Sequence, residues 1–399
     1  MKILVAEALA PSGVELLRRH HEVDERIGLT AEEYRAILPE YDALLVRSQV
    51  KVDAAMIAAG TRLTVIGRAG VGVDNVDLDA ATHAGITVVN APTGNTIAAA
   101  EHTIALLFAL ARKVPAADAS VRRGEWRRSA FTGTELRGKT LGIVGLGKIG
   151  GAIADRARAM EMTVLGSDPY VTAEAAANHG IELVSFDDLL ARSDVVTLHV
   201  PRTKTTAGMV GAAQLARMKP TAFLLNVARG GVVDEAALAA ALAAGTIAGA
   251  AIDVFAAEPP AADNPLLAAP NTVLTPHLGA STAEAQVAVA EEASQQVLDI
   301  LDGRPARYAV NAPLLTPETA RAIAPYLPLA ETLGRFFAQY SRGGVQTLTL
   351  EVAGELAGHD ATPLQAAVLR GFLQDASNER VNLVNAGMLA KSRGITIVE

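Results

Sequence analysis

Three polar side chains, Arg229, Glu258 and His277, each come shortly after a run of apolar residues that predicts a buried strand. Because α/β sheets place ligands at the carboxyl ends of their strands, these side chains are candidate site residues. The imidazole of His277 has an ordinary pKa near neutral and suits a general base that takes a hydroxyl proton. Glu258 could hydrogen-bond that imidazole and stabilise its protonated form, while Arg229 offers a planar fork for a carboxylate. Together with a hydride acceptor, the set would suit the oxidation of a hydroxy acid.

Each of the three residues also has a purely structural interpretation. A single His after a strand can be an ordinary loop residue, an Arg in that place can pair with a surface acid, and the Glu, which precedes two prolines, can simply face solvent. Spacing along the chain does not bring the three side chains together, so both interpretations stay open at this level.

A glycine-rich turn predicts the cofactor site. Gly145, Gly147 and Gly150 have the spacing G-x-G-x-x-G directly after the apolar run at 141–144. The first glycine permits a tight bend, the second lets the backbone approach a pyrophosphate, and the third lets helix and strand pack closely. The next predicted strand ends at Asp168, about twenty residues on, where an acid that binds the ribose belongs. The combination favours a dinucleotide site, although an Asp at a strand end could also simply start a turn.

Two regions of alternating strands and helices position these residues. Short apolar runs predict strands at 3–6, 43–46, 63–66 and 86–89, and then at 141–144, 163–167, 195–200, 222–226, 247–253 and 273–275. Amphipathic segments between them predict helices. Such alternation indicates an α/β fold with parallel sheets that are covered by helices on both faces.

Local patterns predict where several helices begin. Thr30 and Glu33 have the spacing of a capping box before a helix over 31–38. Ser281 and Glu284 have the same spacing before a helix that runs to residue 302. The uncharged run 236–252 is divided by a glycine, so we interpret it as a helix followed by a buried strand, and no membrane span is expected.

Two further segments differ in polarity. Residues 95–112 predict a long helix that is too apolar for a surface helix, so we expect it to join domains or to lie in a subunit interface. The stretch 120–128 is polar and basic and contains the single tryptophan, Trp126. Its charge favours a solvated linker.

Length and composition limit the possible classes. A chain of 399 residues is expected to form two or three domains. The net charge of −8 argues against a nucleic-acid partner. The absence of cysteine excludes disulfides and thiolate metal sites and agrees with a cytoplasmic protein, and no metal is expected.

Taken together, the motifs closely resemble those of the D-isomer-specific 2-hydroxyacid dehydrogenases. The likeness is carried in the family's order by residues 67–77, 100–105, 145–150, 227–231, 253–255 with Glu258, and 275–282. The resemblance implies two Rossmann-like doubly wound parallel-sheet domains with a cleft between them. The substrate-binding domain would be 1–98, completed by 283–315, and the NAD-binding domain would be 99–282.

The resemblance also assigns roles to particular residues. The catalytic residues would be Arg229, Glu258 and His277, with no metal. The cofactor NAD would be bound by Gly145, Gly147, Lys148, Ile149, Gly150, Asp168, Pro201, Thr206, Ala228 and Asp253. The substrate would be bound by Arg47, Ser48, Arg68, Gly70, Val71, Gly72 and Asn95. Arg47 could instead pair with Asp42 or another surface acid. Asn95 could serve through its backbone as a helix N-cap, which is compatible with contact to a ligand.

Residues 316–399 predict a separate, small α+β domain with a half-exposed strand over 345–352. The segment resembles the intervening domain of the long bacterial members of the family, in which a serine-binding regulatory domain follows. Because the sequence stops within that likeness, we expect no inhibition by serine.

The function that the resemblance implies is NAD-dependent oxidation of a small phosphorylated 2-hydroxy acid by a homodimer or homotetramer. Alternatives are a dehydrogenase for glyoxylate, hydroxypyruvate or lactate, or an NAD-binding scaffold like the corepressors that share this fold. A phosphorylated substrate needs cations beyond those for its carboxylate. We therefore expect Arg47 and Arg68 to bind the phosphate, with Arg127 or Arg128 as candidates from a neighbouring subunit.

Overall fold

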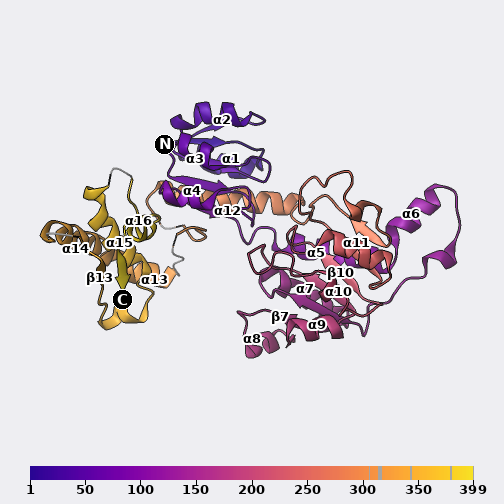
Figure 1. Cartoon of the computed structure of the whole chain (residues 1–399). Helices are drawn as coiled ribbons and strands as arrows, with labels where there is room; N and C mark the ends of the chain where they lie inside the picture. Colours follow the sequence, from indigo (N-terminus) through magenta and orange to yellow (C-terminus); the bar gives the residue numbers. More distant parts are fainter. Residues whose placement is uncertain (305, 313–316, 342–343, 378–379, 399) are drawn as a thin grey trace. The chain divides into compact units, whose positions relative to one another are not determined.

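The computed structural model describes residues 1–304, 306–312, 317–341, 344–377 and 380–398 (Figure 1). The chain divides into two compact units. Unit 1 comprises Met1–Gly94 with Gln286–Glu399, and unit 2 comprises Asn95–Ala285. The predicted boundary between 315 and 316 lies outside the described residues, and the division into three domains stays a prediction.

Unit 1 contains a five-stranded parallel sheet with the order β2-β1-β3-β4-β5. Its strands are β1 (Lys2–Val5), β2 (Glu22–Glu25), β3 (Ala43–Val46), β4 (Val65–Arg68) and β5 (Thr87–Asn90). The last two begin one or two residues later than predicted. Strand β2 was not predicted because its sequence, Glu-Val-Asp-Glu, is mostly charged; it lies at the edge of the sheet beside β1.

Helices cover the faces of this sheet. They are α1 (Pro11–Arg18), α2 (Ala31–Ile37) with the 3₁₀ turn η1 (Leu38–Glu40), α3 (Ala54–Ala59), α4 (Leu78–His83) and α12 (Ala283–Leu301). The capping box at the start of α2 is confirmed, since Thr30 and Glu33 each bond the other's backbone N–H. Helix α12 packs its apolar residues Val297, Leu298 and Leu301 into the cluster formed by the sheet. One face of the first sheet is therefore completed by residues that follow the whole of unit 2 in the sequence.

The C-terminal part of unit 1 is built from helices and a two-stranded parallel sheet. These elements are α13 (Pro317–Ile323), η4 (Ala324–Tyr326), α14 (Leu327–Tyr340), β13 (Thr347–Thr349), η5 (Gly354–Gly358), α15 (Thr362–Leu373), η6 (Gln374–Ala376), α16 (Ala386–Ser392) and β14 (Thr396–Val398). The predicted strand over 345–352 is thus present but shorter. Asn385 is fully buried and donates to the carbonyl oxygen of His83 at 3.2 Å, while Asn382 donates to that of Gly85 at 2.5 Å.

Unit 2 contains a seven-stranded parallel sheet with the order β12-β11-β10-β9-β6-β7-β8. The strands are β6 (Thr140–Val144), β7 (Thr163–Ser167), β8 (Glu182–Leu183), β9 (Val195–Leu198), β10 (Phe223–Asn226), β11 (Gly249–Ile252) and β12 (Thr272–Leu274). Counted from β6, this is the order 3-2-1-4-5-6 of the doubly wound nucleotide-binding fold, extended by one strand. The predicted fold class, two such parallel sheets with a small C-terminal domain, is confirmed.

The helices of unit 2 are α5 (Thr96–Ala111), α6 (Val114–Arg122), α7 (Lys148–Ala159), α8 (Ala173–Asn178), α9 (Phe186–Arg192), α10 (Ala212–Leu215) and α11 (Glu235–Ala243), with 3₁₀ turns η2 (Arg128–Phe131) and η3 (Pro265–Ala268). The apolar helix predicted over 95–112 is α5, whose Leu106, Leu107 and Leu110 pack in the core of unit 2. Among the helices of the described residues, none is both long and apolar enough to cross a membrane.

One local prediction was wrong, and a second was only partly right. The helix that begins near residue 283 is capped by Thr282, which accepts a hydrogen bond from the backbone of Ala285 at 3.1 Å, rather than by Ser281. The stretch 120–128 is not wholly a linker, because α6 extends into it. Ser120 is fully buried there and donates to Glu125 at 2.7 Å. Figure 1 shows α6 and the loop after it projecting from the rest of unit 2, and Trp126 in that loop is 78% exposed.

Candidate active site

His277 and Glu258, which lie 19 residues apart in the sequence, meet in unit 2. Glu258 lies on the loop after β11, and His277 lies on the loop after β12. The Nδ1 atom of His277 is 2.7 Å from the Oε2 atom of Glu258. The other carboxylate oxygen, Oε1, accepts a hydrogen bond from the backbone N–H of Phe255 at 3.1 Å. The imidazole is therefore oriented by a carboxylate that is itself held by the backbone.

The electrostatics of the pair favour a charged carboxylate. Burial raises the pKa of Glu258, but the hydrogen bond and the charge of His277 outweigh this effect, and the net pKa lies below its ordinary value. Both side chains are part-exposed, at 44% for His277 and 38% for Glu258, so a ligand can reach them. A proton taken up by His277 would be stabilised by its neighbour.

The backbone around His277 is held by Asp253, at the end of β11. Its carboxylate is fully buried and accepts hydrogen bonds from the N–H groups of Leu278 at 2.8 Å and Gly279 at 3.0 Å. The hydroxyl of Thr275, 2.6 Å away, and the Nε2 atom of His102, 3.1 Å away, also contact it. Burial raises the pKa of Asp253, but these hydrogen bonds lower it by more, so the net pKa is below its ordinary value.

This buried network keeps His277 in an uncommon backbone conformation. Its φ is 56°, in the left-handed region that residues other than glycine rarely adopt. The N–H of His277 donates to the backbone carbonyl of Asp253 at 2.8 Å, so bonds to Asp253 lie on both sides of the histidine's Cα. Asp253 thus has a positioning role in addition to the cofactor contact predicted for it, and that contact stays a prediction.

Arg229 lies on the loop after β10, which Asn226 fixes. Asn226 is buried, donates to the backbone carbonyl of Arg229 at 3.0 Å and accepts from the N–H of Ala228 at 3.2 Å. Arg229 donates through Nη1 to the carbonyl of Ala228 at 2.7 Å. Arg229, Glu258 and His277 therefore follow the carboxyl ends of three adjacent parallel strands, β10, β11 and β12, of one sheet.

The glycine-rich turn has the shape that a dinucleotide requires. Gly145 has a φ of +94°, and a Cβ atom there would lie 2.5 Å from the carbonyl oxygen of His199. A Cβ at Gly150 would overlap the carbonyl of Gly145, whereas at Gly147 none of the described atoms lies within 4 Å of such a Cβ. Two glycines are thus demanded by packing, and the third leaves open space where a pyrophosphate could approach. The residues present fit NAD.

Other predicted cofactor residues surround this turn. Asp168 follows β7 and accepts a hydrogen bond from the N–H of Leu146, inside the turn, at 2.8 Å. Lys148 and Ile149 begin α7, the helix whose N-terminus would face the pyrophosphate. Pro201 and Thr206 share the loop after β9, where the hydroxyl of Thr206 donates to the carbonyl of Pro201 at 2.5 Å. Strands β6 and β9 are neighbours at the point where the strand order reverses, which is where such sheets bind ligands.

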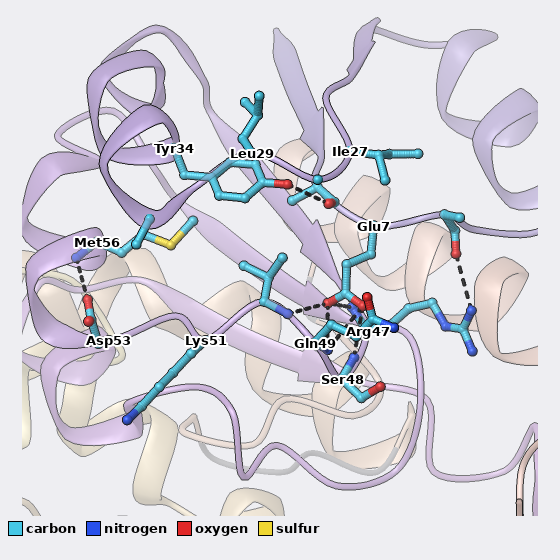
Figure 2. Close-up of a pocket in the computed structure, with 15 residues that line it drawn as sticks. Glu7, Ile27, Leu29, Tyr34, Arg47, Ser48, Gln49, Lys51, Asp53 and Met56 are labelled. Carbon is cyan, nitrogen blue, oxygen red and sulfur yellow. Dashed lines mark hydrogen bonds between the residues drawn. The ribbon is translucent and has the colours of Figure 1, made fainter. Parts of the chain in front are cut away.

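In unit 1, Arg47 and Ser48 follow β3 and line a pocket of about 560 Å³ (Figure 2). The Nη1 atom of Arg47 donates to the carbonyl of Ala8 at 3.3 Å. The alternative pairing of Arg47 with Asp42 is wrong, because Asp42 bonds Arg62 at 2.8 Å and the backbone N–H of Lys2.

The remaining substrate candidates follow β4 and precede α5. Arg68 ends β4, and a Cβ at Gly70 would overlap its guanidinium, so Gly70 makes room for that side chain. The carbonyl of Val71, next to Gly72, accepts a hydrogen bond from Asn90 at 2.5 Å. Asn95 occupies the N-cap position of α5 but makes no side-chain cap bond. Within the described chain its buried Oδ1 atom meets no hydrogen-bond donor, so the predicted N-cap position is confirmed through the backbone, whose carbonyl accepts from the N–H of Ala99 at 3.0 Å, and not through the side chain.

Three residues that support the site were missed as functional candidates: Glu7, Asn75 and His102. Glu7 bonds the loop that carries Arg47 and Ser48, Asn75 bonds the carbonyls of the same loop, and His102 bonds Asp253. One signal was available for Glu7, which is a carboxylate at the carboxyl end of a buried strand. Asn75 and His102 lie inside motifs that identify the family, but their partners are distant in the sequence.

Comparison with known proteins agrees with this geometry. Residues 104–279 match the model of the D-isomer specific 2-hydroxyacid dehydrogenase NAD-binding domain, and residues 322–399 match that of the D-3-phosphoglycerate dehydrogenase intervening domain. A D-3-phosphoglycerate dehydrogenase from Synechocystis sp. is 49% identical over 100% of this chain and 72% of its own length. One from Archaeoglobus fulgidus is 47% identical over 100% of this chain and 76% of its own length.

Solved structures share the fold. A protein from Thermus thermophilus has a TM-score of 0.72 and 37% identity, covering 78% of this chain and 100% of its own. The D-lactate dehydrogenase of Aquifex aeolicus, complexed with NAD and lactic acid, has a TM-score of 0.68 and 28% identity. The match covers 76% of this chain and 96% of that dehydrogenase. The chain therefore belongs to the D-isomer specific 2-hydroxyacid dehydrogenases, NAD-dependent oxidoreductases, in the branch that carries the D-3-phosphoglycerate dehydrogenase intervening domain.

Proposed function

We propose that this chain oxidises D-3-phosphoglycerate to 3-phosphohydroxypyruvate with NAD, the first committed step of L-serine synthesis. The observation that carries the chemistry is the 2.7 Å contact between His277 Nδ1 and Glu258 Oε2. The substrate assignment is supported by the D-3-phosphoglycerate dehydrogenases that are 47–49% identical over the whole chain. The lactate dehydrogenase and glyoxylate reductase structures are only 27–30% identical.

The residues of the pair divide the work. Because Nδ1 of His277 faces Glu258, its Nε2 atom is the nitrogen that would take the proton of the substrate hydroxyl. Glu258 fixes the orientation of the ring and stabilises the imidazolium that results. When bound, NAD accepts the hydride from the carbon that carries the hydroxyl. The alcohol thereby loses one proton and one hydride and becomes a ketone.

Cationic side chains would hold the two anionic groups of the substrate. Arg229, on the loop after β10, would bind the carboxylate bidentately. Arg47 and Arg68, at the ends of β3 and β4, would bind the phosphate. Arg127 or Arg128 would add a contact from a neighbouring subunit in a homodimer or homotetramer, an assignment supported by the projection of α6 and its following loop from unit 2.

The test is the reduction of NAD, followed by absorbance, with D-3-phosphoglycerate, D-glycerate, D-lactate and glycolate as separate substrates. The expected result is the highest kcat/KM for D-3-phosphoglycerate. Higher efficiency with an unphosphorylated acid would assign the chain to another dehydrogenase of the family. NAD binding in calorimetry without turnover of any of the four would favour the scaffold alternative.

A further inference from the structure

The carboxylate of Glu7 binds four consecutive backbone N–H groups of the loop after β3. Its Oε1 atom accepts from Arg47 at 2.9 Å and Val50 at 2.9 Å, and its Oε2 atom accepts from Ser48 at 3.2 Å. The N–H of Gln49 lies 3.1 Å from both oxygens. Figure 2 shows these bonds converging on Glu7, which is only 7% exposed.

The other side of the same loop is held by Asn75. Its Nδ2 atom donates to the carbonyl of Arg47 at 3.0 Å and to that of Val50 at 2.7 Å. All four N–H groups of the loop 47–50 therefore have an acceptor inside the protein, and two of its carbonyls have a donor. The peptide groups of the loop are fixed from two sides, while the side chains of Ser48 and Gln49 remain exposed.

The place of this arrangement in the fold suggests its purpose. Glu7 follows β1 and the loop 47–50 follows β3, and these two strands are neighbours in the order β2-β1-β3-β4-β5. The chain leaves β1 toward β2 on one side and continues from β3 toward β4 and β5 on the other, so the strand order reverses between β1 and β3. Parallel sheets bind ligands at such a point. Consecutive N–H groups that converge on one point form a site for an anion. In this protein an internal anion already occupies that site.

We propose that Glu7 is a positioning residue that fills the anion site of the loop 47–50 and so directs the side chains of Arg47 and Ser48 toward the substrate. The identity of the substrate rests on the proposed function. The substrate anion accordingly meets the side chains of this loop and not its backbone N–H groups. Only an ionised carboxylate suits the position, because both of its oxygens accept, whereas a glutamine would turn an NH₂ group toward N–H donors.

The decisive variant is Glu7→Ala, with Glu15→Ala as a matched control, since Glu15 is an exposed carboxylate on α1. In Glu7→Ala we expect amide hydrogen exchange in a peptide covering 44–56 to become faster. We expect the KM for D-3-phosphoglycerate to rise by about tenfold or more, because several charge-assisted hydrogen bonds are lost. The KM for NAD should change by less than about twofold, because the glycine turn belongs to unit 2.

Chemical rescue separates positioning from a general loss of structure. Added formate can occupy the vacated site as an anion, so it should lower the raised KM and restore protection from exchange. Formamide, which is neutral and of similar size, should do neither. Glu7→Gln provides a second variant in case Glu7→Ala fails to fold, and it should show the same rise in KM and faster exchange, without rescue because its side chain still fills the space.

Three results would overturn the proposal. Unchanged exchange in the loop of both variants would show that Glu7 does not hold it. Equal effects of formate and formamide would point to simple filling of space. A lower KM in Glu7→Ala would mean that the substrate binds the freed N–H groups. If the wild-type protein does not oxidise D-3-phosphoglycerate, the proposed function fails by itself, and the exchange measurement still decides the role of Glu7.

Discussion

Replacing Asp253 by asparagine tests whether one buried carboxylate holds the catalytic loop. In the wild type, Oδ1 contacts Thr275, His102 and the N–H of Leu278, while Oδ2 accepts from the N–H of Gly279 at 3.0 Å. Asparagine keeps one oxygen, which can still accept from Thr275, His102 and the N–H of Leu278. Its NH₂ group would then face the N–H of Gly279, so two donors would meet at a site with no exposure to water.

The expected cost follows from these contacts. Leaving a buried donor without an acceptor costs about 1–3 kcal/mol, and the three remaining hydrogen bonds lose the strength that the charge gave them. The free energy of unfolding should fall by about 2–4 kcal/mol. For a unit of this size, that corresponds to a decrease in Tm of roughly 5–15 °C. Because His277 lies between the tethered groups, kcat should also fall, on the order of tenfold to a hundredfold.

The pH dependence of stability provides a second signature. The net pKa of Asp253 in the folded protein is lowered, so its contribution to stability is present above the ordinary carboxyl pKa of about 4. That contribution is lost as the pH falls through the lower folded pKa. The difference in Tm between wild type and Asp253→Asn should therefore be largest near neutral pH and should shrink in acid.

Differential scanning calorimetry between neutral and acid pH, together with steady-state kinetics, measures both effects. Asp155→Asn is the control, because it makes the same chemical change at an exposed position of α7 and should alter stability by less than about 0.5 kcal/mol. A decrease in Tm of less than about 2 °C for Asp253→Asn, with kcat within about twofold, would refute the reasoning.

Three further predictions concern the proposed chemistry. His277→Asn should lower kcat by about a hundred- to ten-thousand-fold with little change in NAD affinity, since asparagine tolerates a positive φ; near-normal turnover at saturating NAD would remove His277 from the mechanism. NAD should be preferred over NADP, because Asp168 would repel a 2′-phosphate, and equal kcat/KM for both cofactors would contradict its assignment. Arg47→Ala should reduce kcat/KM with D-3-phosphoglycerate far more than with D-glycerate, whereas equal losses would assign Arg47 to the carboxylate or to folding.

The features that could be predicted from the sequence depend on neighbours along the chain. The capping box at Thr30, the turn at Gly145 and most strands follow from local spacing and apolar runs. Errors arose where local signals were ambiguous or weak. Two adjacent hydroxyl residues before α12 made the wrong cap plausible, and the charged sequence of β2 hid an edge strand that β1 stabilises by pairing.

The site was predictable in its chemical groups but not in the contacts that hold them. His277 and Glu258 stood out because strand ends in α/β sheets carry ligand-binding residues. The roles of Glu7 and Asp253 arise from hydrogen bonds to residues at least 22 positions away, which no local pattern encodes. The unsatisfied Oδ1 of Asn95 likewise becomes apparent only when the surrounding atoms are in place.

The interrupted sequence of unit 1 has a consequence for synthesis on the ribosome. The five strands of its larger sheet all precede residue 95, but Val297, Leu298 and Leu301, which cover one face of that sheet, follow the whole of unit 2. At about 5–20 residues per second, the ribosome needs roughly 10–40 s to make the intervening segment. During that time the apolar residues Ile3, Val5 and Leu45 lack the part of their cover that α12 supplies, although α1 already packs there through Leu17. The nascent chain should be most prone to aggregation in this interval, and unit 2, being continuous, should complete its fold first.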